Sequence, residues 1–426
     1  MRVFMIGIGG IGMSALAQLY ADGRHAVTGS DRERSPITEM LEKKGIRALV
    51  GQRTENVPRD TDLVVYSDAV PDNNPERTRA RELGIRQVSY FEALGEVTRG
   101  RVTIAVAGTH GKTTTTAMLT KILKDAGEEP TAIVGSIVRE FDSNYLPGGE
   151  GPFVVEACEY RDHILKLAPT FLVITNIEWD HTDWFPSLTA LQDTFREAVH
   201  RVKDEGVIIA NPDDPNVAPV LFGAKVPLIP YLREEVPELP VVGEFNRMNA
   251  RAAKAAARAF APGIPVADID RSLTAFSGTW RRFERKGTMS EGTEVYDDYA
   301  HHPTAIRHTL RAAREKFPGK RITLVFHPHL YTRTRDLFTE FADELAKADR
   351  VILLPVYAAR EEPVPGVTSD ALADAVRQMN PNVLSLPTFE AAEQELRKDA
   401  DREDVVFTVG AGDVYKLADR LVQKSV

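Results

Sequence analysis

Cysteine is almost absent from this chain of 426 residues, where Cys158 stands alone. A single cysteine excludes an internal disulfide framework and a cysteine-based metal cluster. Long apolar runs are also missing, since none approaches the roughly 20 residues that cross a bilayer. The net charge of −9 argues against a general nucleic-acid binder. Because Arg2 leads directly into a β-type run, we expect no leader peptide, and the cytoplasm is the expected compartment.

The length and the alternation of apolar segments indicate how the chain is organised. At this length about three domains are expected. Strand-like and helix-like runs alternate, which predicts an α/β protein with parallel sheets. We expect an N-terminal Rossmann-like domain over residues 1–100, a central nucleotide-binding domain over 101–285 and a C-terminal Rossmann-like domain over 286–426. Val226–Pro240 is predicted to be a surface excursion or edge segment, and residues 287–292 a turn or linker. The expected strands are Arg2–Ile6, His25–Gly29, Asp62–Ser67, Val102–Ala107, Phe153–Glu156, Phe171–Thr175, Val207–Ala210, Glu294–Asp297, Arg321–Phe326, Arg350–Leu354, Val383–Leu386 and Val405–Val409.

The most informative motif follows the strand-like run Val102–Ala107. The run breaks into Gly108-Thr-His-Gly-Lys112-Thr-Thr and resumes as an amphipathic helix. This order places backbone N–H groups and a helix N-terminus against phosphates, with Lys112 neutralising charge and Thr113 able to bind Mg²⁺. Val106 stands where the usual spacing has its first glycine. A chance Gly-Lys-Thr is the alternative, but the flanking pattern favours a site for ATP or GTP.

A second glycine motif lies near the N-terminus. Gly7-x-Gly9-x-x-Gly12 follows a strand, and Asp31 comes nineteen residues after Gly12. This pattern fits a dinucleotide fingerprint and, taken alone, predicts an NAD-dependent oxidoreductase. A nucleotide-sugar diphosphate satisfies the same geometry, because both ligands bring a pyrophosphate to the helix N-terminus. A redox cofactor would leave the second phosphate loop unexplained, so we favour the nucleotide sugar.

Two strand ends of the central block carry polar side chains. Glu156 ends one strand, and Asn176-Ile-Glu-Trp-Asp-His181 follows another. Ligands of open α/β sheets collect at the carboxyl ends of the strands, so Glu156 and His181 are expected to face the γ-phosphate. Oxygen atoms of Thr113 and Glu156 suit Mg²⁺, whereas a histidine ligand is unusual for that ion. His181 could instead orient a water or a carboxylate, and Glu156 alone could be a solvated strand end.

Taken together, these motifs resemble those of the Mur ligases, and their order covers all three blocks. Within that family the set is most similar to the member that adds L-alanine to UDP-N-acetylmuramate. The phosphate loop with Val106 is also typical of the family. The matching segments are Gly-Ile-Gly-Gly-Ile-Gly-Met-Ser (7–14), Gly-Thr-His-Gly-Lys-Thr-Thr-Thr-Thr (108–116), Glu-Ala-Cys-Glu-Tyr-Arg (156–161), Asn-Ile-Glu-Trp-Asp-His (176–181), Gly-Glu-Phe-Asn-Arg-Met-Asn (243–249), Arg-Arg-Phe (281–283), Asp-Asp-Tyr-Ala-His-His-Pro (297–303), His-Pro-His-Leu-Tyr-Thr-Arg-Thr (327–334) and Gly-Ala-Gly-Asp (410–413).

The resemblance implies an ADP-forming ligase of peptidoglycan precursor synthesis that uses ATP and Mg²⁺. ATP would convert the lactyl carboxylate of UDP-N-acetylmuramate to an acyl phosphate, and the amine of L-alanine would attack it. Positioning and charge neutralisation should dominate such a reaction. The partners would be these small molecules, without nucleic acid or membrane, and the protein would be a monomer or homodimer.

The resemblance also assigns roles to individual residues. The expected catalytic residues are Lys112, Glu156, His181, Arg282 and Asp298, and the expected metal ligands are Thr113, Glu156 and His181. ATP is expected at Gly108, Thr109, His110, Gly111, Lys112, Thr113, Thr114, Asn246, Asn249, Arg282 and Asp298. The UDP-sugar is expected at Gly9, Gly10, Ile11, Gly12, Ser30, Asp31 and Ser67. The amino acid is expected at Tyr299, His301, His329 and Arg333, with Arg333 suited to its carboxylate.

Simpler interpretations exist for several of these residues. Asn246 could be only the N-cap of its helix. Arg281 and Arg282 could be a solvated surface pair, and the two histidines at 301 and 302 could form a turn before Pro303.

The chain also departs from relatives at two positions. Arg196 stands where sister ligases carry a carbamylated lysine. The alanine-adding member also lacks that lysine, so this departure agrees with the resemblance. Leu330 stands where some relatives carry arginine, so alanine binding would depend more on Arg333.

Three other functions compete with this interpretation. A murein-peptide ligase would join a tripeptide to the same UDP-sugar, and residues 185–192 slightly favour this enzyme. The glycine run at 7–14 and residues 359–369 favour the alanine-adding enzyme. A nucleotide-sugar-binding regulator with residual ATPase activity is a second alternative, and the oxidoreductase is a third.

Overall fold

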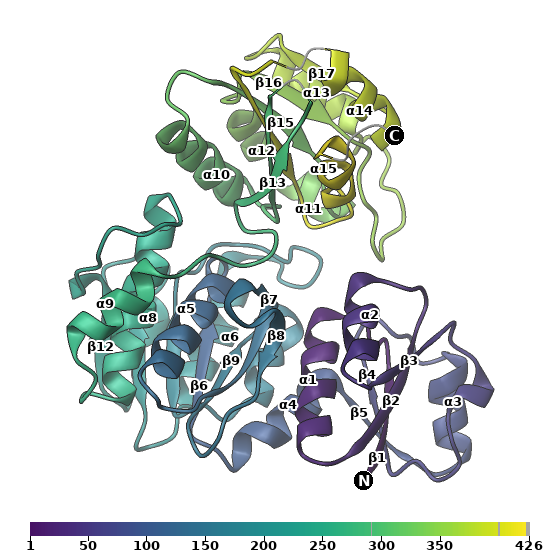
Figure 1. Cartoon of the computed structure of the whole chain (residues 1–426), viewed down its shortest axis with the longest axis vertical. Helices are drawn as coiled ribbons and strands as arrows, with labels where there is room; N and C mark the ends of the chain where they lie inside the picture. The colour runs from purple at the N-terminus through teal and green to yellow at the C-terminus, as the bar shows by residue number, and fades with distance from the viewer. Residues whose placement is uncertain (291, 399–400, 423–426) are drawn as a thin grey trace. The chain divides into compact units, whose positions relative to one another are not determined.

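The computed structural model describes residues 1–290, 292–398 and 401–422 (Figure 1). Three separate sheets, each covered by helices, form a three-domain α/β protein and confirm the predicted fold class. The chain folds into two compact units. The first unit holds the first two sheets, and the second unit holds the third sheet together with two short segments, 178–190 and 239–248. The predicted domain boundaries at residues 100 and 285 remain predictions.

The first sheet is parallel throughout, in the order β3-β2-β1-β4-β5. Its strands are β1 (Arg2–Ile6), β2 (Ala26–Asp31), β3 (Arg47–Val50), β4 (Leu63–Tyr66) and β5 (Arg86–Ser89). Apolar side chains point to both faces, as expected for strands buried on both sides. The helices are α1 (Ile11–Asp22), α2 (Pro36–Lys43), α3 (Pro75–Glu82) and α4 (Tyr90–Arg99), with a 3₁₀ turn, η1, at Thr54–Asn56.

The second sheet has the order β12-β11-β10-β6-β9-β7-β8, and only the β7–β8 pair is antiparallel. Its strands are β6 (Thr103–Ala107), β7 (Thr131–Val138), β8 (Ser143–Leu146), β9 (Phe153–Glu156), β10 (Phe171–Ile174), β11 (Val207–Ala210) and β12 (Leu228–Pro230). The α-helices of this part are α5 (Lys112–Asp125), α6 (Leu188–His200), α7 (Ala218–Leu221), α8 (Glu244–Phe260) and α9 (Val266–Thr274). Its 3₁₀ segments are η2 (Arg139–Phe141), η3 (Tyr160–Lys166) and η4 (Tyr231–Arg233). Because β12 is an edge strand, the predicted edge character of Val226–Pro240 is confirmed.

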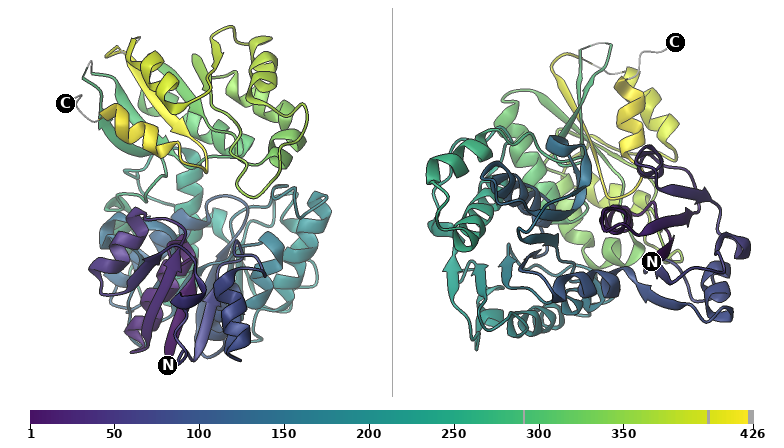
Figure 2. Two further views of the ribbon diagram at one scale, coloured as in Figure 1. Left: turned by 90° about the vertical axis from the view of Figure 1, so that its right-hand side faces the viewer. Right: turned by 60° about the horizontal axis from the view of Figure 1, so that its bottom comes forward.

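The third sheet has the order β13-β14-β18-β15-β16-β17, and its two faces are covered by different helices (Figure 2). Its strands are β13 (Glu284–Thr288), β14 (Glu294–Asp298), β15 (Arg321–Phe326), β16 (Arg350–Leu353), β17 (Val383–Ser385) and β18 (Asp404–Val409). The helices α10 (Pro303–Lys316), α12 (Phe338–Leu345) and α13 (Ser369–Arg377) pack on one face. The helices α14 (Phe389–Lys398) and α15 (Tyr415–Val422) pack on the other, and α11 is a short helix at Tyr331–Asp336.

One sequence prediction holds only in part at the start of the third sheet. Residues 287–292 are expected to form a turn or linker, but Gly287 and Thr288 belong to β13, and the N–H of Gly292 donates to the carbonyl of Met289 in the turn that follows. This strand pairs antiparallel with β14, and its register shifts between Arg285 and Gly287. A charged, glycine-containing edge strand lacks the apolar run that would identify it from sequence.

The helices of the structure also bear on membrane insertion. Over the described residues, none of them combines the length and the apolar character needed to cross a bilayer.

Candidate functional site

The phosphate loop joins β6 to α5 and is pinned by residues that follow β10. The backbone N–H of Thr109 donates to the carbonyl of Asn176 at 3.0 Å, and the N–H of His110 donates to the Asn176 side chain at 2.9 Å. The Thr175 hydroxyl donates to the His110 carbonyl at 2.6 Å. The carboxyl end of β10 therefore shapes the loop. Val106, at the position of the usual first glycine, is fully buried inside β6.

Both glycines of the loop are required by their surroundings. Gly108 has φ +129° and Gly111 has φ +84°, a region that favours glycine. A Cβ at Gly108 would lie 2.1 Å from the Thr175 hydroxyl oxygen, and one at Gly111 would lie 2.1 Å from Oδ1 of Asn249. The loop backbone is thus free to approach phosphates closely.

Lys112 begins α5 and forms a buried ion pair with Glu159. Its Nζ lies 3.0 Å from each carboxylate oxygen of Glu159, and it also donates to the carbonyls of Gly108 and Thr109. Burial lowers the pKa of Lys112, but Glu159 and the nearby Glu156 raise it by more, so the net pKa lies above its usual value. Lys112 is therefore held in its charged form.

Glu156 ends a strand, β9, as the sequence predicts, and β9 lies next to β6 in the sheet. Its Oε2 accepts the N–H of Gly135 on β7 at 2.9 Å. The hydroxyl of the buried Thr113 and this carboxylate are the oxygen donors that Mg²⁺ prefers. One N–H bond leaves room on the carboxylate for a cation, because a carboxylate has about four acceptor positions. The residues present therefore fit the metal.

Replacing Gly135 by alanine tests the position of Glu156 without removing it. The new Cβ would lie 2.3 Å from Oε2 of Glu156, and the flexible carboxylate would have to move. We expect kcat to fall by about 10–100-fold, because a displacement near 1 Å costs up to that amount. Thermal unfolding should change little. Unchanged kcat would show that the reaction does not depend on this position of Glu156.

Asn246 and Asn249 occupy the same helix, α8, in different settings. Helix α8 begins at Glu244, so Asn246 is not its N-cap, and that simpler interpretation is wrong. The Asn246 amide donates to the carbonyl of Val242 at 2.7 Å. Asn249 is 5% exposed, and its Nδ2 has no hydrogen-bond partner among the described residues. A buried amide of this kind beside Gly111 is suited to a nucleotide ligand.

The N-terminal glycine loop is shaped by the residues predicted to bind the UDP-sugar. Oδ2 of Asp31 accepts the N–H of Gly9 at 2.8 Å, so this carboxylate holds the loop. A Cβ at Gly12 would lie 2.7 Å from the Tyr90 ring. Ser30 is fully buried and its hydroxyl donates to Glu76. The N–H of Gly10 donates to the carbonyl of Gly7 and closes a turn, after which Ile11 begins α1. Ser67 follows β4.

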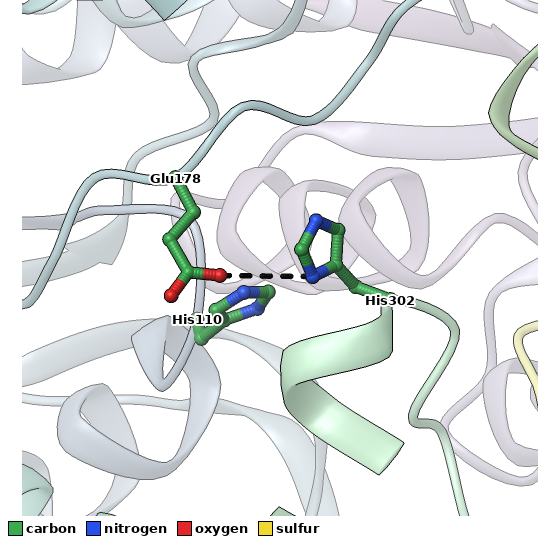
Figure 3. Close-up of side chains that lie close together, drawn as sticks. All are labelled: His110, Glu178 and His302. Carbon is green, nitrogen blue, oxygen red and sulfur yellow. Dashed lines mark ion pairs between the residues drawn. The ribbon is translucent and has the colours of Figure 1, made fainter. Parts of the chain in front are cut away.

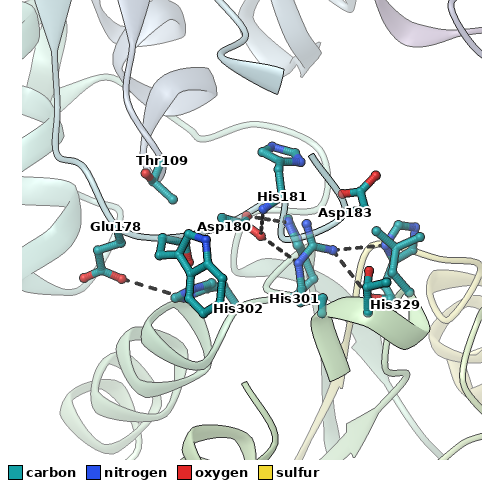
Figure 4. Close-up of polar contacts among 12 residues, drawn as sticks. Thr109, Glu178, Asp180, His181, Asp183, His301, His302 and His329 are labelled. Carbon is teal, nitrogen blue, oxygen red and sulfur yellow. Dashed lines mark hydrogen bonds and ion pairs between the residues drawn. The ribbon is translucent and has the colours of Figure 1, made fainter. Parts of the chain in front are cut away.

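In the second unit, Asp180 and Arg333 form a buried ion pair. Nε of Arg333 donates to Oδ1 of Asp180 at 2.8 Å, and the two residues are 3% and 4% exposed. Another guanidinium nitrogen lies 3.2 Å from Nδ1 of His329. Nε2 of His301 lies 4.0 Å from Oδ2 of Asp180 (Figure 4). Three of the four residues predicted for the amino acid are thus in one cluster around a carboxylate that the sequence did not single out.

The charges in this cluster are fixed by its surroundings. Burial raises the pKa of Asp180, but Arg333 and the nearby histidines hold it well below its usual value. Burial and the Arg333 charge lower the pKa of His329 to about 3 and place the pKa of His301 well below its usual value. Both imidazoles are therefore neutral at pH 7, beside a charged arginine.

The segment 178–190 is attached to the third domain at further points. Glu178 faces His302, with 3.7 Å between Oε2 and Nδ1 (Figure 3). The same Nδ1 accepts the N–H of Thr304 at 3.3 Å, so His302 is the N-cap of α10. His181 has φ +51°, and its N–H donates to Oδ1 of Asp180 at 2.7 Å. His181 therefore follows directly on the carboxylate that holds Arg333.

Arg281 and Arg282 differ in role. Arg281 is 4% exposed, pairs with Asp297 at 2.8 Å and donates to the carbonyls of residues 410–412, so the surface interpretation is wrong for it. The Arg282 guanidinium lies 4.9 Å from the centre of the Tyr299 ring, and that of Arg281 lies 5.2 Å from it. Arg282, not Arg281, is the half-buried member of the pair.

Asp298 ends β14 in a buried position. Its carboxylate accepts the N–H groups of Phe283 at 3.1 Å and Ala300 at 2.9 Å. Burial raises its pKa to about 6, against the opposing charge of Arg282. Because this pKa lies above the unfolded value of 3.8, the folded state binds more protons between these values. This group therefore costs stability increasingly as the pH rises through that window.

We expect the same group to limit activity in acid. Since Asp298 is predicted to contact ATP as a carboxylate, kcat/KM for ATP should fall below an apparent pKa of about 6. An Asp298→Asn variant should be slower and should lack this acid limb. A pH profile of kcat/KM measures both, and retention of the limb in Asp298→Asn would assign it to another group.

Comparison with known proteins adds the family context. Family models match three stretches: "Mur ligase family, catalytic domain" at residues 2–101, "Mur ligase middle domain" at 106–235 and "Mur ligase, glutamate ligase domain" at 281–412. The chain is 38% identical over 450 residues to the UDP-N-acetylmuramate–L-alanine ligase of Clostridium novyi, covering 99% of this chain and 97% of the relative. The crystal structure of the UDP-N-acetylmuramate–alanine ligase of Thermotoga maritima superposes with a TM-score of 0.83 at 28% identity, over 99% and 98% of the two chains. A murein peptide ligase from Psychrobacter arcticus gives 0.75 at 25% identity, over 100% and 99%.

Proposed function

The chain belongs to the Mur ligase family, and we propose that it joins L-alanine to the lactyl carboxylate of UDP-N-acetylmuramate at the expense of ATP. The observation that carries this proposal is the match, over 99% of the chain, to the alanine-adding relative from Clostridium novyi. The murein peptide ligase structure is less similar in both identity and TM-score than the Thermotoga maritima structure. The alanine-adding reaction is therefore favoured over the tripeptide reaction.

The first step that we propose is phosphoryl transfer. A carboxylate is a poor electrophile because its leaving group would be oxide, and phosphorylation turns that oxygen into part of a phosphate leaving group. The lactyl carboxylate oxygen attacks the γ-phosphorus, and ADP leaves. Lys112 and the N–H groups of the phosphate loop would hold the β- and γ-phosphates, with Asn249 beside them. Mg²⁺ at Thr113 and Glu156, with His181 as the third predicted ligand, would neutralise phosphate charge.

The second step is attack by the amine of L-alanine on the acyl carbon. The tetrahedral intermediate then expels inorganic phosphate, and the nitrogen loses one proton. Arg333 would bind the carboxylate of alanine, because a guanidinium fits a carboxylate through two parallel hydrogen bonds. The neutral His301 and His329 would line this site together with Tyr299. Arg282 and Asp298 are proposed to contact the transferring phosphoryl group and ATP.

Phosphate release provides the direct test. The full-length protein is mixed with ATP, Mg²⁺ and UDP-N-acetylmuramate, and L-alanine, glycine, L-serine or the murein tripeptide is added in parallel. Release that requires both the UDP-sugar and L-alanine, with a product heavier by one alanine residue, is the expected result. Release with the tripeptide alone would establish the murein-peptide ligase activity instead. Binding of the UDP-sugar without release of phosphate would indicate a nucleotide-sugar-binding regulator. Binding of NADH would support the oxidoreductase instead.

A further inference from the structure

The ammonium group of Lys112, which is expected to bind the phosphates of the nucleotide, is already ion-paired with Glu159. An ammonium has three N–H donors. In this structure, the acceptors around Nζ of Lys112 are both oxygens of Glu159, each at 3.0 Å, and the carbonyls of Gly108 and Thr109. Phosphate oxygens that bind Lys112 must therefore replace at least one acceptor of the protein.

Glu159 is the acceptor whose charge conflicts with a phosphate. Its side chain is 1% exposed, and that of Lys112 is 15% exposed, so solvent screens the pair little. Glu159 comes three residues after Glu156, at the end of β9, and Cys158 stands directly before it. A second carboxylate is thus held within hydrogen-bond reach of the phosphate-loop lysine. Two anions that share one ammonium in a poorly solvated place repel each other.

We propose that Glu159 is a positioning residue that holds Lys112 before nucleotide binds and yields it to the β- and γ-phosphates when ATP or ADP enters. The inference rests on the proposed nucleotide site at the phosphate loop. In the absence of ATP, Glu159 balances the positive charge of the buried Lys112 ammonium and holds it against the phosphate loop. After the reaction, Glu159 recovers Lys112 and thereby favours the release of ADP. Part of the phosphate-binding energy is spent on breaking the pair, and this lowers the observed affinity.

The experiment compares nucleotide affinities of the full-length protein and its Glu159→Gln variant. Glutamine keeps the size and one acceptor oxygen but removes the negative charge. We expect ATP and ADP to bind roughly three- to thirtyfold more tightly to E159Q, because Lys112 is no longer held by an ion pair. AMP has neither a β- nor a γ-phosphate, so its affinity should stay unchanged. Isothermal titration calorimetry with each nucleotide and Mg²⁺ measures these constants.

Two further variants keep the test decisive. Asp125→Asn removes the partner of Lys121, a more exposed pair on the same helix α5, and should leave all three affinities unchanged. Glu159→Asp keeps the charge but shortens the side chain, and should tighten ATP and ADP binding by less than E159Q does; it replaces E159Q if that variant fails to fold. Unchanged or weaker ATP binding in these Glu159 variants would overturn the inference. Failure of the unmodified protein to bind ATP would instead refute the proposed nucleotide site.

Discussion

Replacing Lys112 by alanine is expected to abolish ADP formation, with kcat reduced by at least about 10³-fold. The reaction that we propose brings ATP and the carboxylate of the UDP-sugar together, so it depends on neutralising several negative charges. Lys112 supplies a cation at the start of α5, where the helix N-terminus also favours negative charge. Its removal takes away that cation and also takes its ion-pair partner from the buried carboxylate of Glu159. Both changes oppose the binding and transfer of phosphate.

The measurement is ADP production in the presence of UDP-N-acetylmuramate and L-alanine. Lys121→Ala serves as the matched control, because Lys121 lies on the same helix and pairs with Asp125, a more exposed carboxylate than Glu159. This control should retain full activity. Since breaking a buried pair destabilises a protein by about 3–5 kcal/mol, the thermal unfolding of Lys112→Ala must be recorded as well. ADP formation at the unmodified rate by a folded Lys112→Ala protein would remove the phosphate loop from the reaction.

The sequence predicts the fold well where strands are apolar and uninterrupted. The run at β6, the glycine turn and the amphipathic α5 follow from periodicity alone, and so do the strands β14, β15 and β18. The sequence does not predict strand β7, which contains Gly135, the residue whose N–H binds the Glu156 carboxylate of the neighbouring strand β9. A glycine at this position weakens the local strand pattern. The glycine is needed because the Glu156 side chain of the neighbouring strand β9 occupies the space of a Cβ. The short strands β3 and β5 depend similarly on their sheet partners.

The residues of the candidate site likewise fall into those that the sequence predicts and those that it does not. Lys112, Thr113 and Glu156 were identified because their motifs are contiguous in sequence. Glu159 and Asp180 belong to motifs of the sequence but receive no role from it, because their importance comes from partners that are 47 and 153 residues away. Pairings over such distances are set by how strands are ordered in a sheet and where segment 178–190 packs, and neither follows from local spacing. Arg333 could be predicted as a carboxylate ligand, but the carboxylate that it already binds could not.

That pairing bears on the second large effect, which is expected for Arg333→Ala. If Arg333 binds the carboxylate of alanine, its removal should raise the KM for L-alanine by about 10²-fold or more, since truncating one partner of a buried charge pair costs about 2–5 kcal/mol. The KM for ATP and for the UDP-sugar should change little, because Arg333 is predicted to bind the amino acid alone. Arg333→Lys keeps the positive charge without the planar fork, so an intermediate KM is expected.

The control for this prediction lies two residues further along α11. Arg335 pairs with Asp336 at the surface, and Arg335→Ala should leave all three KM values unchanged. Arg333→Ala leaves Asp180 buried without its main counter-charge, so its melting temperature should fall, whereas the Arg335 variant should melt normally. Steady-state kinetics at varied L-alanine, with a melting curve for each variant, separate loss of binding from loss of structure. An unchanged KM for L-alanine in a folded Arg333→Ala protein would remove this residue from the amino-acid site and leave the Asp180 pair with a purely structural role.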